Sequence, residues 1–179
     1  MEYLDRARQQ CASGDPLGAQ ITLEAALREH GGDPRVRLAY AAIFLQVGDW
    51  QSGLDQLEQV RSPWNPVVEA YIGGALLGLN RVSDAKDTLD CAYERAPQDA
   101  YVLLKRGELY CRLGVYSVAI DALERTLKLG APDATTREAA RRLLRFARTK
   151  HSSGFIKYIP RQLNVPRVLR RRQVLAADS

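Results

Sequence analysis

The chain has 179 residues, of which 46% are hydrophobic and 26% charged, an ordinary composition for one globular domain with a continuous core. No apolar run reaches the roughly 18 residues that a membrane-spanning helix needs. The polar residues 1–5 do not resemble a signal peptide, so we expect a cytoplasmic protein. The three cysteines, Cys11, Cys91 and Cys111, are widely spaced, and we interpret them as reduced packing residues.

Charge is divided unevenly along the chain. Residues 1–133 contain 14 lysines and arginines against 19 acidic residues, a net charge of −5. Residues 134–179 contain 12 against 2, a net charge of +10. This asymmetry predicts an acidic partner for the basic region: another protein, a nucleic acid, an anionic membrane or the acidic part of the same chain.

The pattern of small, apolar and turn residues in 1–65 predicts two helix–turn–helix units, 1–33 and 34–65. In the first, Ala7 is the small residue of the first helix, and the second helix runs to about Glu29. Asp33 followed by Pro34 predicts the start of the next helix, because an aspartate N-cap and a proline at the first helical position are favoured there. The second unit is short, since residues 62–66 end its second helix early.

Residues 66–133 contain one 34-residue pattern twice in succession, as 66–99 and 100–133. Its small and apolar positions coincide in the pairs Gly73 and Gly107, Ala85 and Ala119, Leu89 and Leu123. Two antiparallel helices approach closely only where a side chain is nearly absent, so we expect Gly73 to pack against Ala85. Gly107 is expected to pack against Ala119 in the same way. Units of this kind must stack, because none can bury its apolar face alone.

The repeated positions resemble the tetratricopeptide-repeat pattern, W-x2-L-G-x2-Y, then A-x3-F, then P, which has a period of about 34 residues. The second copy supplies Leu103, Gly107, Tyr110, Ala119, Leu123 and Pro132, and the first supplies Gly73, Leu76, Ala85, Leu89 and Pro97. The resemblance implies an all-α fold: a right-handed superhelical solenoid of about four helix–turn–helix units, with a C-terminal capping helix and an extended basic tail. The turns are expected at residues that tolerate a left-handed backbone: Gly14, Gly48, Asn80 and Gly114.

Residues 134–150 predict the capping helix. Its apolar residues fall on one face, at Ala140, Leu143, Leu144 and Ala147. A second stripe is basic and consists of Arg137, Arg141, Arg145 and Arg148. A cap with a charged outer face is the favoured interpretation, and a helix dedicated to nucleic acid is the alternative. Residues 151–154 are expected to end the helix.

Residues 151–179 form a basic, aliphatic arm. The sequence [IV]-P-R-x-L occurs in it twice, at 159–163 and 165–169, and the residue before each proline is expected to be extended. Coincidence in a basic segment and a docking arm that folds on a partner are both open interpretations. The predicted docking residues are Phe155, Tyr158, Ile159, Pro160, Arg161, Leu163, Val165, Pro166, Arg167, Leu169, Arg170, Arg171 and Arg172.

In proteins with these repeats, the first helices of successive units line a groove that binds a segment of another protein. The resemblance places in this groove Leu38, Ala42, Leu45, Val67, Ala70, Tyr71, Gly74, Leu77, Tyr101, Leu104, Lys105, Glu108, Cys111 and Arg112. We expect about a third of them to lie in the core between helices instead. The family's carboxylate clamp of Lys and Asn residues is missing, since its positions hold Leu4, Arg8, Ala39, Val67 and Tyr71.

Residue types that carry catalysis are sparse. The chain has two histidines, His30 and His151, with no metal-ligand spacing, and no phosphate-binding glycine loop after a strand. We therefore predict no enzyme, no small-molecule substrate, no cofactor and no metal.

The predicted function is that of an adaptor, chaperone or assembly subunit. It binds a protein segment in the groove and docks on a larger assembly through the basic arm. The alternatives are a nucleic-acid-associated protein that uses the arginine-rich region, a peripheral membrane protein, and self-regulation in which the arm occupies the groove.

Overall fold

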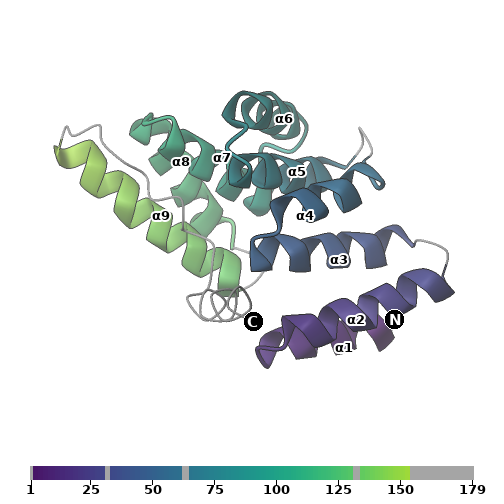
Figure 1. The fold of residues 1–179 in the computed structure, drawn as a ribbon. Helices are drawn as coiled ribbons and strands as arrows, with labels where there is room; N and C mark the ends of the chain where they lie inside the picture. Colours follow the sequence, from purple (N-terminus) through teal and green to yellow (C-terminus); the bar gives the residue numbers. More distant parts are fainter. Residues whose placement is uncertain (1, 31–32, 62–64, 131–133, 154–179) are drawn as a thin grey trace, which may run out of the picture. The chain divides into compact units, whose positions relative to one another are not determined.

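The computed structural model describes residues 2–30, 33–61, 65–130 and 134–153. Within these ranges it contains nine helices and no strand, which confirms the all-α prediction (Figure 1). The helices are α1 (Glu2–Ala12), α2 (Pro16–Glu29), α3 (Pro34–Val47), α4 (Trp50–Glu58), α5 (Pro66–Gly78), α6 (Val82–Arg95), α7 (Ala100–Arg112), α8 (Tyr116–Lys128) and α9 (Ala134–Ser153). The N-cap carboxylate of Asp33 accepts a hydrogen bond from the backbone N–H of Arg35, as expected for the start of α3.

Four tight turns, one in each helix pair from α1–α2 to α7–α8, share one conformation. The left-handed residues are Gly14, Gly48, Asn80 and Gly114, with φ of 83°, 86°, 64° and 74°. In each turn the next N–H donates to the carbonyl five positions back, as from Asp15 to Gln10 (2.8 Å) and from Val115 to Tyr110 (2.9 Å). The four turn residues predicted from the sequence are therefore confirmed.

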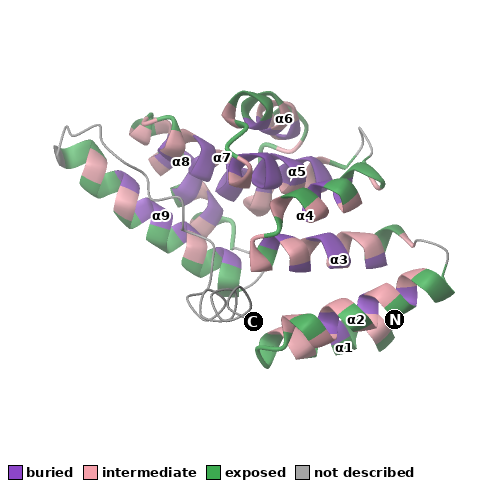
Figure 2. Cartoon of the chain, in the orientation of Figure 1, coloured by how far each residue is buried: buried purple, intermediate pink, exposed green. Residues whose placement is uncertain are grey.

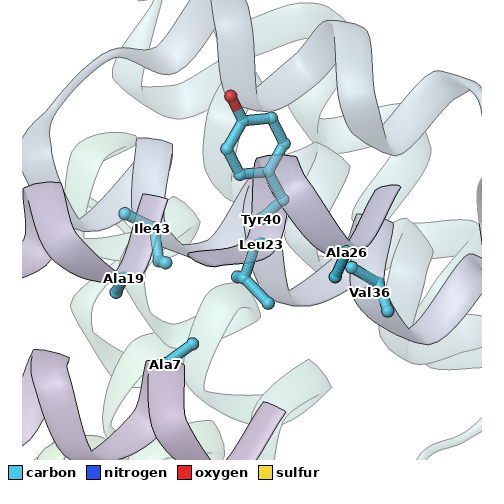
Figure 3. Close-up of a cluster of buried hydrophobic side chains, with 7 residues drawn as sticks. All are labelled: Ala7, Ala19, Leu23, Ala26, Val36, Tyr40 and Ile43. Carbon is cyan, nitrogen blue, oxygen red and sulfur yellow. The ribbon is translucent and has the colours of Figure 1, made fainter. Parts of the chain in front are cut away.

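The described helices form two compact units, α1–α4 within residues 1–60 and α5–α9 within residues 61–160. In the first unit, α1 packs on α2, α2 on α3 and α3 on α4. A cluster of buried side chains fills its first three helices (Figure 3): Ala7, Ala19, Leu23, Ala26, Val36, Tyr40 and Ile43. Small alanines on α1 and α2 let these helices approach closely, and the larger residues of α3 cover them.

In the second unit, each helix packs on the next, and α7 also packs on both α5 and α9. This is the contact pattern of stacked repeats, in which the first helices of successive pairs touch. Buried residues cover most of α5 and α7, whereas α9 alternates buried and exposed positions (Figure 2). The α5–α7 pair is thus the most enclosed part of this unit.

The close approach of paired helices is confirmed, and the side chains nearest to the two glycines are leucines. A Cβ atom at Gly73 would lie 2.5 Å from Cγ of Leu89, and one at Gly107 would lie 2.6 Å from Cγ of Leu123. The nearest side chains are therefore these leucines, one helical turn beyond Ala85 and Ala119. The helices cross so that each glycine accommodates a branched side chain.

Helix α9 packs on α8 and α7, and the predicted apolar residues Ala140, Leu143, Leu144 and Ala147 are all buried. The helix is expected from the sequence to extend to about Lys150 and continues three residues further, so it ends at Ser153 within the predicted break at 151–154. The hydroxyl of Ser152 donates to the carbonyl of Arg148 (2.8 Å), and Thr149 donates to Arg145 in the same manner (2.9 Å). These bonds let polar residues remain in the last turns of the helix.

None of the described helices is long and apolar enough to span a membrane. The predicted docking arm, including both Pro-Arg motifs, lies outside the described residues.

Candidate protein-binding face

The contact between α5 and α7 carries a pair of stacked tyrosines. The rings of Tyr71 on α5 and Tyr101 on α7 have centroids 4.3 Å apart and an interplanar angle of 30°. Both side chains are half-buried, so they pack on each other and still contribute to the surface. Asp99 fixes the start of α7, because its Oδ1 accepts hydrogen bonds from the backbone N–H groups of Tyr101 and Val102, both at 2.9 Å.

Next to this stack, the side chain of a buried lysine on α7 packs against α5. Lys105 is only 8% exposed, and a Cβ atom at Gly74 would lie 3.0 Å from its Cε. Gly74 therefore makes room for the lysine stem. The Nζ of Lys105 donates to Oε2 of Glu108 at 3.0 Å and lies 5.7 Å from the centroid of the Tyr101 ring. The ammonium thus has both a carboxylate and an aromatic neighbour.

Arg112 completes an ion network with Lys105 and Glu108. Its Nη1 donates to the carbonyl of Leu77 at 2.7 Å, and its Nη2 lies 3.5 Å from Oε1 of Glu108. The Leu77 carbonyl belongs to the last turn of α5 and also accepts a hydrogen bond from the backbone N–H of Asn80 at 3.0 Å. Burial raises the pKa of Glu108, but the charges of Lys105 and Arg112 outweigh it, so the pKa lies below its ordinary value. Glu108 therefore stays ionised.

An open hollow adjoins the tyrosines at the N-terminal ends of α5 and α7. It has a volume of about 550 Å³, and it is lined by Val67, Tyr71, Gln98, Asp99, Ala100, Tyr101, Leu129 and Gly130. Leu129, at the end of α8, is 44% exposed and so offers apolar area to the hollow. An aromatic and aliphatic surface with one carboxylate is suited to side chains of a protein segment.

The structure separates the predicted groove residues into two groups. Seven of the 13 residues other than Cys111 are buried: Leu45, Ala70, Gly74, Leu77, Leu104, Lys105 and Glu108. Six are half-buried: Leu38, Ala42, Val67, Tyr71, Tyr101 and Arg112. The expected core share of about a third is therefore too low, because first helices pack on each other as well as on their partners. Cys111 is buried too.

Leu38, Ala42 and Leu45 lie on α3 in the first unit. Leu45 packs inward, since a Cβ atom at Gly53 on α4 would lie 2.5 Å from its Cδ2. Its prediction as a groove residue fails because the small residue of this close contact lies on α4 and leaves space for the leucine.

The hollow contains residues that the groove prediction missed. Gln98 and Asp99 precede α7, and Leu129 and Gly130 follow α8, so a prediction confined to first helices overlooks them. Aspartate before an apolar helix is a readable N-cap signal. The position of Leu129 follows only from the packing of α8.

The described part of α9 presents a basic outer surface. A second hollow is lined by Glu138, Arg141, Leu144, Arg145 and Arg148. Arg148 bonds to Glu124 on α8 at 2.7 Å, and Arg145 lies 3.7 Å from Glu138. The predicted basic stripe is therefore exposed, and two of its arginines pair with carboxylates at the surface.

Among the described residues, no group of three or more His, Cys, Asp and Glu side chains is placed to hold a metal. Burial, and then the nearby Glu108 carboxylate, raise the pKa of Cys111 to about 12. Its thiol therefore stays protonated at neutral pH and is a poor nucleophile.

No protein-family model matches the chain, and no curated protein matches it. Solved structures do. TTC0263, a thermophilic TPR protein of Thermus thermophilus, aligns with a TM-score of 0.70 and 22% identity over 98% of this chain and 97% of that one. MamA from Desulfovibrio magneticus RS-1, from residue 41 on, aligns with a TM-score of 0.58 and 18% identity over 84% of this chain and 90% of that one. Cut9–Hcn1, a hetero-tetramer of the APC/C, aligns with a TM-score of 0.62 and 21% identity over 81% of this chain and 29% of that one.

Proposed function

Because the chain has the tetratricopeptide-repeat fold, we propose that it is a protein-interaction adaptor that binds a segment of another protein on the α5–α7 face. The observation that carries this proposal is the open hollow beside the stacked Tyr71 and Tyr101 rings. Aromatic residues that are rigid before binding lose little conformational entropy on association, and they dominate many protein interfaces.

The chemistry of the face favours a segment with apolar side chains near its centre. Val67, Tyr71, Tyr101 and Leu129 offer apolar area, whereas the charges of Lys105 and Glu108 satisfy each other. An amphipathic helix or an extended apolar peptide meets these requirements, because either can present anchoring side chains at regular spacing.

The narrower role that we propose is that of a chaperone or assembly subunit within a larger complex. The basic surface of α9 and the basic arm that follows it would dock on an acidic protein of that complex. Among the structural neighbours, Cut9–Hcn1 is a hetero-tetramer of the APC/C, which supports the proposal of an assembly role.

Two features of α9 favour a protein over a nucleic acid or a membrane as its partner. Its apolar residues Ala140, Leu143 and Ala147 are buried, so they are not available to enter a lipid surface. Its aromatic residue Phe146 packs edge-to-face with Tyr116 of α8, at a centroid distance of 6.2 Å, and so does not form a platform for stacking bases.

The test compares two exposed leucines in equivalent positions. Leu129 precedes Gly130 at the end of α8 and lines the hollow, whereas Leu113 precedes Gly114 at the end of α7, is 41% exposed and does not line it. We would purify tagged wild type, Leu129→Ser and Leu113→Ser from cells after nuclease treatment and identify co-purifying proteins by mass spectrometry.

A defined protein retained by Leu113→Ser and reduced several-fold by Leu129→Ser is the expected result. Equal retention by both variants would contradict the α5–α7 face as the site. Loss of all partners on nuclease treatment would replace the proposal with the nucleic-acid alternative.

A further inference from the structure

We propose that the hollow beside Tyr71 and Tyr101 binds the chain's own segment 165–169, with Arg167 directed at Asp99. The arm would then compete with the protein segment of the proposed function, and only this competition rests on that function. Docking itself is independent, and it follows from the charge of the hollow, the composition of the arm and the length of chain between them.

Among the described residues that line the hollow, Asp99 is the one charged side chain, and none is a cation. The Oδ1 atom of Asp99 accepts both capping bonds, while Oδ2 has no hydrogen-bond partner within the described ranges. A guanidinium placed there would gain a charge-assisted bond to Oδ2, and its stem would lie on apolar surface.

Two other hollows lined by the described residues contain arginines. One is lined by Arg61 and Arg95 together with Glu69 and Asp87, so its formal charges balance. The other is lined by three arginines and Glu138, so it is basic and would repel a basic segment. Of these three hollows, the one at Asp99 alone has a net negative charge, and charge therefore favours it for a basic segment.

The arm contains two segments with matching chemistry. In each, a single arginine follows proline, at 159–163 and at 165–169. The other four residues of the second segment are all apolar, whereas Gln162 follows the arginine in the first. Proline and valine can pack on tyrosine rings and on Leu129. The residue before a proline is expected to be extended from the sequence alone, which lowers the entropy lost on docking. The adjacent residues 170–172 are all arginines and lack this aliphatic setting.

Chain length favours the second segment. Helix α9 has 20 residues and is about 30 Å long. The hollow ends at Gly130, four residues before α9 begins, which adds at most about 13 Å. Ser153 is therefore at most about 43 Å from the hollow. Arg167 is 14 residues beyond Ser153 and reaches about 46 Å, enough for this largest distance, whereas Arg161 is 8 residues beyond it and reaches about 26 Å, enough only for a shorter one.

The experiment uses the full chain with no client present. The photo-crosslinking residue p-benzoylphenylalanine in place of Val168 would be irradiated in dilute protein, and crosslinks in the monomer band would be mapped by mass spectrometry. The expected partners are residues 98–101 and 129–130. Crosslinks elsewhere on the chain, or crosslinks confined to dimers, would overturn docking within one molecule.

Matched substitutions test the charge contact. Asp99→Asn keeps the N-cap, since asparagine caps as well as aspartate, and removes the charge. The control for this variant is Asp49→Asn, which likewise keeps the N-cap of α4 and removes its charge but lies outside the hollow. We expect Asp99→Asn and Arg167→Gln to lower the intramolecular crosslink several-fold, and Asp49→Asn, Arg161→Gln and Arg171→Gln to leave it unchanged.

Equal losses with Arg161→Gln or Arg171→Gln would overturn the assignment to 165–169 in favour of general attraction. An unchanged yield in Asp99→Asn would overturn the role of Asp99. Because no client is present, these results do not depend on whether the adaptor function is correct.

Discussion

The two units solve the same packing problem with the small residue on opposite helices. In the second unit, the glycines lie on the first helix of each pair, where Gly73 accommodates Leu89 and Gly107 accommodates Leu123. In the first unit, Gly53 lies on the second helix of its pair and accommodates Leu45 from the first. Close helix approach thus requires one small residue in the contact, but either helix can supply it.

This difference decides which side chains can reach the surface. Where the first helix carries the leucine, as at Leu45, that side chain packs against the second helix of the pair. It therefore does not contribute to the outer face. Where the first helix carries the glycine, its neighbours are free to contact the next first helix. The stacked tyrosines and the network of Lys105 and Glu108 occur in the unit of the second type.

Buried polar side chains follow the same division. Among the described residues they are Glu69, Lys105, Glu108, Thr126 and Thr136, all in the second unit. The core cluster of the first unit has no charged member. A buried charge costs free energy unless it is paired, and here Lys105 pairs with Glu108 at 3.0 Å.

The largest expected effect comes from breaking this buried ion network. Glu108→Leu should lower the free energy of unfolding by about 3 kcal/mol, because Lys105 and Arg112 lose their carboxylate in a buried setting. Lys105→Met combined with Glu108→Leu should recover much of the loss, since it removes both charges of the pair. Urea unfolding of the two variants beside wild type measures this, and a double variant no better than the single one would contradict the explanation.

A smaller effect should follow from filling the glycine contacts. Gly107→Ala places a Cβ atom against Leu123 and should destabilise the protein by about 2 kcal/mol, despite the better helix propensity of alanine. Combined with Leu123→Val, its cost should be reduced.

The matched pair in the first unit is Gly53→Ala with Leu45→Val. Positive coupling in both double-mutant cycles is expected, because the contact is the same with the helices exchanged. Coupling in only one unit would show that the two contacts are not equivalent.

The sequence was most informative where one residue type has one structural use. Glycine or asparagine at the four turns, and Asp33 before Pro34, predict their conformations directly, because few residues tolerate a left-handed backbone or cap a helix. The apolar face of α9 follows from spacing alone in the same way.

Residues of the binding face were harder to predict. Helical spacing says which positions share a face, but it does not say which of two helices contributes the small residue at a contact. For that reason Leu45 was assigned to the groove although it packs on α4. Leu129 was missed because its exposure depends on the packing of α8, which no local pattern encodes.

The smallest of these effects is a pH dependence that differs between the units. In the second unit the pKa of Glu108 is lowered, against the effect of burial, by Lys105 and Arg112. In the first unit the side-chain and backbone hydrogen bonds from Arg35 lower the pKa of Asp33 to about 2. A carboxyl with a lowered pKa in the folded state stabilises it above the unfolded pKa, which is about 4.3 for glutamate and about 3.9 for aspartate, and this contribution is lost as the pH falls.

Acidification should therefore weaken α7 from about pH 4.3 downward, and α3 from about pH 3.9 toward pH 2. Amide hydrogen exchange, read separately for the two helices between pH 5 and pH 2.5, measures both losses once the intrinsic exchange rates are corrected for pH. Glu108→Gln should remove part of the pH dependence of α7 and none of that of α3, and Asp33→Asn should do the reverse. If either substitution altered both helices equally, the acid sensitivity would belong to the whole chain and not to these two carboxyls.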